Sequence, residues 1–134
     1  MSKVRRIKVR GRVISGVGKG KYYVSLRPYY ALFSSILSAP PFLGTLNVTV
    51  ENGVLNINNL PHTFCPSGYG EIKYALGELR GTKILVLRPC KSVHPQNVFE
   101  IVAPIEIRKW LRLRDGDEIE FDVYIIKEIE EENR

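Results

Sequence analysis

The 134-residue sequence carries 20 lysines and arginines against 14 aspartates and glutamates, a net charge of +6, and 44% of its residues are hydrophobic. This hydrophobic fraction excludes a wholly disordered chain, and no apolar run approaches the ~18–20 residues that cross a bilayer. We expect one domain over 1–134, with 130–134 frayed. The basic start lacks an apolar signal-peptide core, which predicts a soluble, cytoplasmic protein with no membrane partner.

The charges are segregated along the chain. Residues 1–50 hold nine basic residues and no acidic one, whereas residues 115–134 hold nine acidic residues and two basic ones. Apolar and charged residues alternate over 7–13 and again over 119–125, which predicts two half-buried strands. The segregation has two interpretations: opposite charges paired across neighbouring strands, or a basic surface for nucleic acid.

The remaining elements are short. A strand is predicted at 22–26, a helix beginning at Pro28 and ending at 37, strands at 45–50 and 54–57 around an Asn-Gly turn, strands at 71–76, 83–87 and 98–102, and a helix over 105–113. Many short strands with two short helices favour a mainly β fold, a small closed or nearly closed barrel of six to seven strands. Strands do not alternate with long helices, so a doubly wound nucleotide-binding sheet is excluded.

A glycine-rich segment, GVGKGK at 16–21, follows the first predicted strand. Glycines at alternate positions let the backbone approach a ligand and present successive N–H groups to an anion, and Lys19 and Lys21 add positive charge. The alternative is a flexible hairpin tip. The spacing fits neither the P-loop nor the dinucleotide fingerprint, and we place the segment between two strands instead of at the start of a helix.

Three polar side chains interrupt strands that are otherwise apolar. Thr45 and Asn47 point to the same strand face and offer two oxygen ligands, which suits Mg²⁺ completed by substrate phosphates. The alternative is a solvent face beside a turn. Glu100 opens an apolar strand, where a buried carboxylate needs a partner, either a ligand or an arginine.

The cysteines and histidines raise the question of a zinc site. His62 and Cys65, with Cys90 and His94, provide two ligands of each kind. Their spacing differs from paired C-x-x-C, and prolines crowd both segments, so two thiols without a metal are the ordinary interpretation.

Several segments, taken together and in order, resemble the archaeal CTP-dependent riboflavin kinases. They are GRV at 11–13 with GVGKGKYYV at 16–24, PFLGTLNV at 41–48, SVHP at 92–95, EIVAP at 100–104, and IR at 107–108 with LRDGD at 113–117. The resemblance extends from about residue 7 to residue 125. Two positions depart from the family pattern: Ser92 stands where the family usually has threonine, and Leu43 replaces a proline. Neither change removes a ligand group.

The resemblance implies a cradle-loop (RIFT-like) barrel that transfers the γ-phosphate of CTP to the 5′-hydroxyl of riboflavin, giving FMN and CDP. It implies nucleotide binding by Gly16, Val17, Gly18, Lys19, Gly20, Lys21, Ile105, Glu106, Ile107 and Arg108. It also implies Mg²⁺, or another divalent cation, on Thr45 and Asn47, and flavin contacts from Ser92 and Glu100.

Phosphoryl transfer requires positioning and charge neutralisation. Lys19 and Lys21 are therefore the predicted charge-stabilising residues, and Glu100 is the candidate to orient the ribityl chain or accept the hydroxyl proton. We expect a monomer. The alternatives are a basic β-barrel that binds nucleic acid, and a relative that binds flavin or nucleotide without catalysis. Against the first, the aromatic residues do not interleave with the basic ones as a stacking platform requires.

Overall fold

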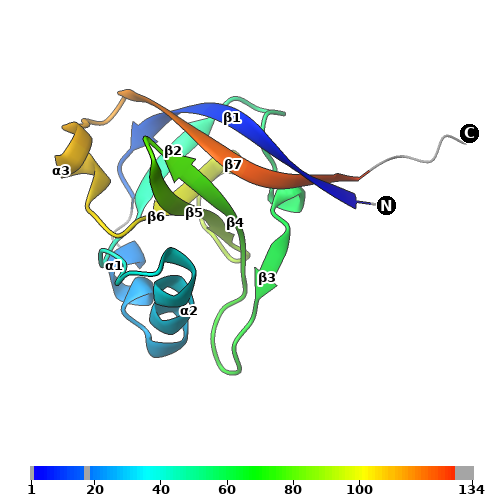
Figure 1. The fold of residues 1–134 in the computed structure, drawn as a ribbon, viewed down its shortest axis with the longest axis vertical. Helices are drawn as coiled ribbons and strands as arrows, with labels where there is room; N and C mark the ends of the chain where they lie inside the picture. Colours follow the sequence, from blue (N-terminus) through cyan, green and yellow to red (C-terminus); the bar gives the residue numbers. More distant parts are fainter. Residues whose placement is uncertain (1, 17–18, 129–134) are drawn as a thin grey trace, which may run out of the picture.

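The computed structural model describes residues 2–16 and 19–128, and seven strands form the frame of this part of the chain. They are β1 (Ser2–Ile14), β2 (Leu46–Val50), β3 (His62–Phe64), β4 (Ile72–Leu79), β5 (Thr82–Pro89), β6 (Val98–Val102) and β7 (Glu118–Glu128). The strand order is β3-β4-β5-β6-β2-β1-β7, and β4 also pairs with β7. Six antiparallel strands thus close a barrel and β3 extends the edge of β4 (Figure 1), which confirms the predicted fold class.

The helices are short and lie outside the barrel. They are α1 (Lys19–Val24), α2 (Arg27–Leu37) and α3 (Ile107–Leu111), with a 3₁₀ turn, η1 (Ile57–Asn59). α2 and α3 confirm the two predicted helices, although α3 is shorter than expected because Arg112 takes a left-handed conformation and ends it. No helix in the described ranges is long and apolar enough to cross a membrane.

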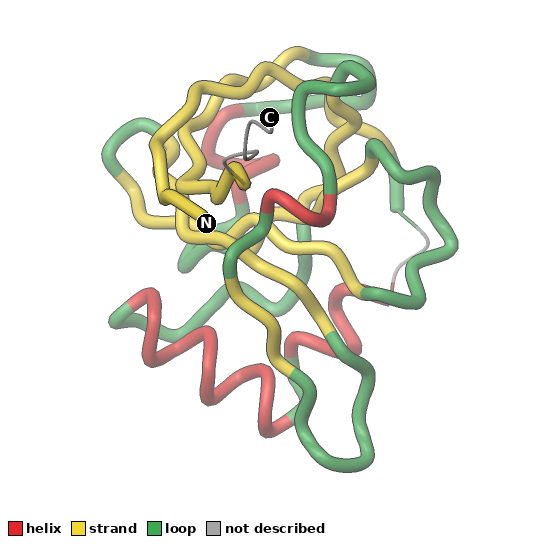
Figure 2. The backbone as a smooth tube through the Cα atoms, turned by 90° about the vertical axis from the view of Figure 1, so that its right-hand side faces the viewer, coloured by secondary structure: helices red, strands yellow, loops and turns green. Residues whose placement is uncertain are grey.

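Two hydrophobic cores position the site. The first fills the barrel, with Val9, Val48, Phe99 and Phe121 at its centre. The second lies between the outer face of the barrel and the helices α1 and α2, which sit together below the strands in Figures 1 and 2. Because of this second layer, β5 is buried continuously over 84–88, on both of its faces. One wall of the barrel is therefore covered by the helices that follow the glycine-rich segment.

Two predicted strands are wrong. Residues 22–26 form the end of α1 and a turn instead of a strand, although tyrosine and valine favour strands. The buried side chain of Val24 packs among the second core, and this tertiary contact overrides local preference. The strand predicted at 54–57 is a turn leading into η1, whose start is capped by the Asn56 side chain.

The glycine-rich segment was also misplaced by the sequence pattern. It leads from β1 into α1, and Gly20 and Lys21 are part of that helix. It therefore does open a helix, contrary to the prediction that it joins two strands. Val17 and Gly18 lie outside the described residues, as do the Lys19 side chain and the predicted frayed end at 130–134.

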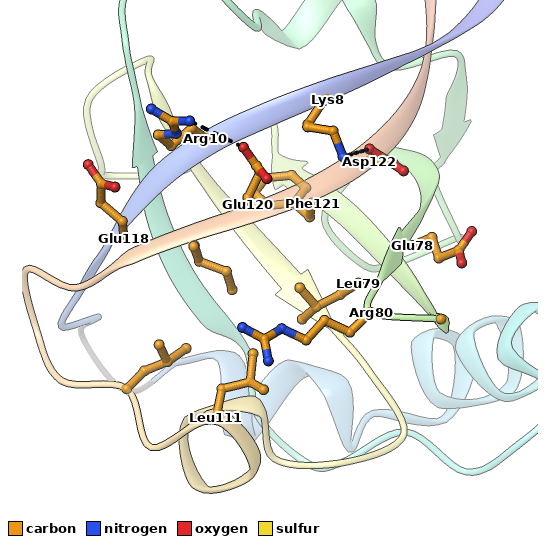
Figure 3. A pocket seen from close by; sticks show the side chains of 13 residues that line it. Lys8, Arg10, Glu78, Leu79, Arg80, Leu111, Glu118, Glu120, Phe121 and Asp122 are labelled. Carbon is orange, nitrogen blue, oxygen red and sulfur yellow. Dashed lines mark hydrogen bonds and ion pairs between the residues drawn. The ribbon is translucent and has the colours of Figure 1, made fainter.

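The charges of β1 and β7 neutralise one another. The two strands pair antiparallel, with Lys8 opposite Asp122 and Arg10 opposite Glu120. The Lys8 Nζ to Asp122 Oδ1 distance is 3.3 Å, and the Arg10 Nη2 to Glu120 Oε2 distance is 3.4 Å (Figure 3). Arg12 pairs with Glu118 in the same way, at 3.1 Å. This confirms cross-strand pairing and weakens the support for a nucleic-acid surface, since Arg6, Lys8, Arg10 and Arg12 already face carboxylates.

Candidate functional site

Two cavities open on either side of the first residues of β2. The smaller one, about 290 Å³, lies between α1, β6 and the loops that follow β3 and β5. The larger one, about 950 Å³, lies between the glycine-rich segment, the loop before β2, and α3. Gly20, Thr45 and Asn47 line both cavities. The two cavities therefore meet at the predicted metal ligands.

The glycine-rich segment packs directly on these ligands. A Cβ atom on Gly16 would overlap the Asn47 amide nitrogen, and a Cβ atom on Gly20 would overlap the Thr45 hydroxyl oxygen. Only glycine lets the backbone come this close. Gly16 and Gly20 thus form one surface in the fold with Asn47 and Thr45, from which they are separated in the chain.

The larger cavity contains five of the ten residues predicted to bind nucleotide. Gly16, Gly20, Lys21, Glu106 and Arg108 line it. An adjoining hollow of about 50 Å³ shares part of its lining with this cavity. It is bordered by Ile105, Glu106, Ile107 and Arg108, which were all predicted to bind nucleotide. Ile107 is buried and packs mainly into the barrel core. Lys21, Arg108 and Arg114 outnumber Glu106 and Asp115 in this lining and give the cavity a cationic wall, which suits a polyanionic ligand.

One cation of this wall is held in place by its neighbours. Arg108 Nη2 donates to Asp115 Oδ1 at 2.6 Å and to the Ile14 carbonyl at 3.2 Å. Ser15 also donates to Asp115. The hydrogen bonds from Ser15 and Arg108 hold the pKa of Asp115 below its ordinary value, and the one from Ser15 has the larger effect. The network joins the end of β1 to α3 and fixes the mouth of the larger cavity.

The smaller cavity contains both residues predicted to contact flavin. Ser92 and Glu100 line it, together with Tyr22, Tyr23 and Tyr69 and several aliphatic side chains. At about 290 Å³ it lies near the lower end of the ~300–1,000 Å³ range of ligand pockets. Aromatic walls with a few polar groups are typical of a site for a flat, conjugated ligand.

Glu100 is the buried carboxylate of the site, with 8% of its surface exposed. It lies opposite Asn47 in the β2–β6 ladder, which places both side chains on the outer face of the barrel. Tyr23 Oη donates to Glu100 Oε1 at 3.1 Å. Burial raises the pKa of Glu100, and hydrogen bonds from the Thr45 and Tyr23 side chains partly oppose that rise. These contacts hold the carboxylate beside Thr45 and Asn47, where the two cavities meet.

Arg88 shapes the loop that carries Ser92, and sequence reasoning missed it. Its guanidinium donates to three backbone carbonyls, those of His94 at 2.9 Å, Pro95 at 2.8 Å and Val98 at 2.8 Å. Arg88 is 8% exposed, and burial lowers its pKa. The sequence signal that could have revealed this residue is an arginine at the end of a strand that is otherwise continuously buried.

The loop held by Arg88 also has an internal hydrogen bond. Ser92 Oγ accepts from the His94 backbone N–H at 3.1 Å. This is a local turn motif that serine and threonine share, so the replacement of the family's threonine by Ser92 keeps the turn as well as the hydroxyl.

The cysteine and histidine pattern does not produce a metal cluster. Among residues 2–16 and 19–128, no three histidine, cysteine, aspartate or glutamate side chains come together in a way that could hold a metal ion. Cys65 and Cys90 are free, exposed thiols on loops.

A third cavity, about 680 Å³, lies on another side of the barrel, between β7, the turn after β4 and the end of α3 (Figure 3). Its floor is formed by core residues such as Leu79 and Phe121. Much of its charged rim is occupied by the ion pairs between β1 and β7. None of the predicted site residues lines it, so the two cavities beside β2 are the candidate site.

Comparison with known proteins agrees with this arrangement. A family model for CTP-dependent riboflavin kinases, which carries the description "domain of unknown function DUF120", matches residues 13–123. The chain belongs to this family. The match begins at the end of β1 and ends within β7, so it covers every element from α1 to α3 and the first part of β7.

Curated relatives of the family are archaeal proteins named riboflavin kinase. One from Pyrobaculum islandicum is 33% identical over 89% of this chain, and one from Ignicoccus hospitalis is 36% identical over 88%. One from Methanococcus aeolicus is 37% identical over 81%. The chain spans 61% of the length of the first relative, 72% of the second and 92% of the third.

Proposed function

We propose that this chain is a CTP-dependent riboflavin kinase, which transfers the γ-phosphate of CTP to the 5′-hydroxyl of riboflavin and releases FMN and CDP. The observation that carries the proposal is the meeting of two cavities at Gly20, Thr45 and Asn47. One cavity has aromatic walls and the other a cationic wall. A phosphoryl donor in one and an acceptor alcohol in the other would bring their reacting atoms together at this junction. Membership of the family supports the same conclusion.

The larger cavity is the proposed site of CTP. Lys21 and Arg108 would face the phosphates, with the backbone of Gly16 and Gly20 beside them. Such groups stabilise the negative charge that is spread over the transferring phosphoryl group. Phe42, Ile105 and Glu106 border the far side of the cavity and its adjoining hollow, where the base would lie.

The junction has the donor set of a magnesium site. Thr45 and Asn47 present a hydroxyl and an amide oxygen beside the glycine backbone, and Mg²⁺ commonly takes one or two protein oxygens and completes its shell with water and phosphate. The residues therefore fit the ion. When bound, Mg²⁺ supplies charge neutralisation at the phosphate oxygens.

The smaller cavity is the proposed site of riboflavin. The Tyr22, Tyr23 and Tyr69 side chains would border the ring system, and Ser92 and Glu100 would hydrogen-bond to the flavin and its ribityl chain. In the transfer a bond forms between the 5′-oxygen and the γ-phosphorus, the bond from that phosphorus to the β,γ-bridging oxygen breaks, and the hydroxyl proton leaves. Glu100 would orient that hydroxyl and accept its proton.

Both proposed ligand sites are built from a single chain, which supports a monomer as the working form. CTP and riboflavin are cytoplasmic metabolites in this proposal, so the reaction is assigned to the cytoplasm.

A direct assay tests the proposal. The purified protein is incubated with riboflavin, Mg²⁺ and each nucleoside triphosphate in turn, and FMN is measured by chromatography. We expect FMN with CTP and much less with ATP, GTP or UTP. FMN formed equally with every nucleotide would contradict the choice of CTP. The absence of FMN with all four would contradict kinase activity altogether.

A further inference from the structure

The helix α1 borders both proposed ligand sites. Gly20 and Lys21 line the larger cavity, and Gly20, Tyr22 and Tyr23 line the smaller one. Two ligands on opposite sides of one short helix each constrain its position. A side chain that links the two sites would transmit this constraint from one site to the other.

We propose that Tyr23 is a positioning residue that ties the glycine-rich segment to Glu100 and makes the binding of riboflavin and nucleotide mutually dependent. This inference rests on the proposed function. It adds to it a second role for Tyr23, besides bordering the ring system, and a property, cooperative binding, that the two-cavity arrangement alone does not require.

The Tyr23 hydroxyl is the direct link. Its oxygen lies 3.1 Å from Glu100 Oε1 and donates a hydrogen bond to it. Burial, and then the neighbouring carboxylate, raises the pKa of the Tyr23 phenol well above its ordinary value, so the phenol remains a donor. Glu100 is in turn the cross-strand neighbour of Asn47. A shift of α1 therefore moves the hydrogen-bond donor of the carboxylate that is aimed at the junction.

The ring of Tyr23 packs against a second aromatic ring. It makes an edge-to-face contact with Tyr29, with 5.6 Å between ring centroids and an interplanar angle of 84°. Tyr29 donates to the Gly70 carbonyl, in the loop that closes the opposite side of the smaller cavity. Val24, the next residue of α1, is completely buried in the second core. Tyr23 thus joins the glycine-rich segment to both walls of the riboflavin site.

This connection predicts positive coupling. A nucleotide that fixes Gly20 and Lys21 also fixes the Tyr23 hydroxyl and, through it, Glu100. Riboflavin then binds to a cavity whose polar groups are already placed, so less ordering opposes its binding. Linkage requires that riboflavin strengthen nucleotide binding by the same factor.

Binding measurements on the whole chain test the inference without turnover. Riboflavin affinity is measured by quenching of flavin fluorescence, with and without saturating CDP and Mg²⁺, and CDP affinity is measured by calorimetry with and without riboflavin. The proteins are the wild type, Tyr23→Phe, which keeps the ring and loses only the hydroxyl, and Tyr30→Phe as control. Tyr30 is 36% exposed on α2 and lines neither cavity.

We expect each ligand to strengthen the other by about fivefold or more in the wild type and in Tyr30→Phe. In Tyr23→Phe the factor should fall to about one, while nucleotide alone still binds. A wild-type factor of one, or an undiminished factor in Tyr23→Phe, would overturn the inference while leaving the proposed function intact. If the wild type binds neither ligand, the proposed function fails, and the inference fails with it.

Discussion

The backbone of Gly20 lies directly against the side chain of Thr45, so closely that a Cβ atom on Gly20 would overlap the Thr45 hydroxyl oxygen. A residue of a helix and the residue directly before a strand thereby share one surface at the junction of two cavities. This contact explains why the glycine is needed at a helical position, where it is otherwise unfavourable.

Gly20→Ala should therefore reduce activity by misplacing the glycine-rich segment. A displacement of about 1 Å at a reacting centre can cost roughly 100-fold in rate, so we expect a fall in kcat/KM for CTP of that order. Alanine favours a helix by up to about 1 kcal/mol over glycine, so the loss cannot come from helix propensity. Steady-state kinetics with the thermal unfolding midpoint checks this. Unchanged kcat/KM in a folded variant would show that the contact with Thr45 does not matter.

Thr45→Ala and Asn47→Ala should each raise the Mg²⁺ concentration that the reaction needs. Loss of one oxygen ligand weakens the site, and we expect the half-saturating concentration to rise by about tenfold or more. Thr49→Ala is the matched control, since Thr49 lies on the same strand, β2, and lines neither cavity. The measurement is a Mg²⁺ titration of the initial rate. An unaltered requirement would remove Thr45 and Asn47 as ligands.

Glu100→Gln should lower turnover and leave nucleotide binding almost unchanged. The amide keeps the shape of the side chain and cannot accept a proton, and loss of a positioned base typically costs about 10²–10⁴ in rate. Glu78→Gln is the control, because Glu78 faces Arg6 on another side of the barrel. Turnover and the Kd of CDP are compared. Full activity in Glu100→Gln would refute the base role, because the glutamine amide can still orient the hydroxyl but cannot accept its proton.

The alternating patterns explain how much of the fold was predictable. β6 has the predicted bounds, and β1 and β7 were recognised because charged and apolar residues alternate over 7–13 and 119–125. Alternation is a local signal with the period of a strand. α1 was missed because Tyr22 and Tyr23 favour a strand when considered alone, and only the second core, which forms from distant residues, makes a helix there favourable.

The residues of the candidate site also include some that local sequence patterns predicted and others that these patterns missed. Gly16, Thr45 and Asn47 were identified because their residue types suit anions and metal ions, and the resemblance supplied Ser92. Arg88 and Tyr23 were missed because their roles depend on partners that are distant in the chain, although the position of Arg88 at the end of an apolar strand was a signal. The role of Arg88 depends on three carbonyls six to ten residues further along the chain, and that of Tyr23 depends on a carboxylate 77 residues away.

Arg88→Lys should weaken riboflavin binding in particular. An ammonium group cannot reproduce the planar fork that reaches three carbonyls, and leaving buried carbonyls without partners costs about 1–3 kcal/mol. We expect a lower unfolding midpoint and a higher KM for riboflavin, with the KM for CTP unchanged. Arg27→Lys, at an exposed position on α2, serves as control. Equal changes in both KM values would indicate general disruption instead of a role in the Ser92 loop.

Asp122 should make stability depend on pH at acidic values. Arg6 joins three strands at the closure of the barrel: its Nε donates to Asp122 on β7 at 3.0 Å and its Nη2 to Glu78 on β4 at 3.2 Å. Hydrogen bonding to Arg6, and secondarily to Lys8, lowers the pKa of Asp122 below its ordinary value. A lowered folded pKa means that the unfolded chain takes up its proton first as the pH falls.

The stabilisation is therefore complete above the unfolded pKa of about 3.9 and is lost as the pH falls through the lower folded value. Asp122→Asn should unfold at a lower temperature than the wild type at pH 7, and the difference should shrink as the pH falls below the unfolded pKa of about 3.9. Glu120→Gln should have a smaller effect, because Glu120 makes a single 3.4 Å ion pair. Thermal unfolding across this pH range measures both. A difference that is the same at pH 7 and pH 3 would mean that the Asp122 charge contributes nothing and that the asparagine acts only through packing.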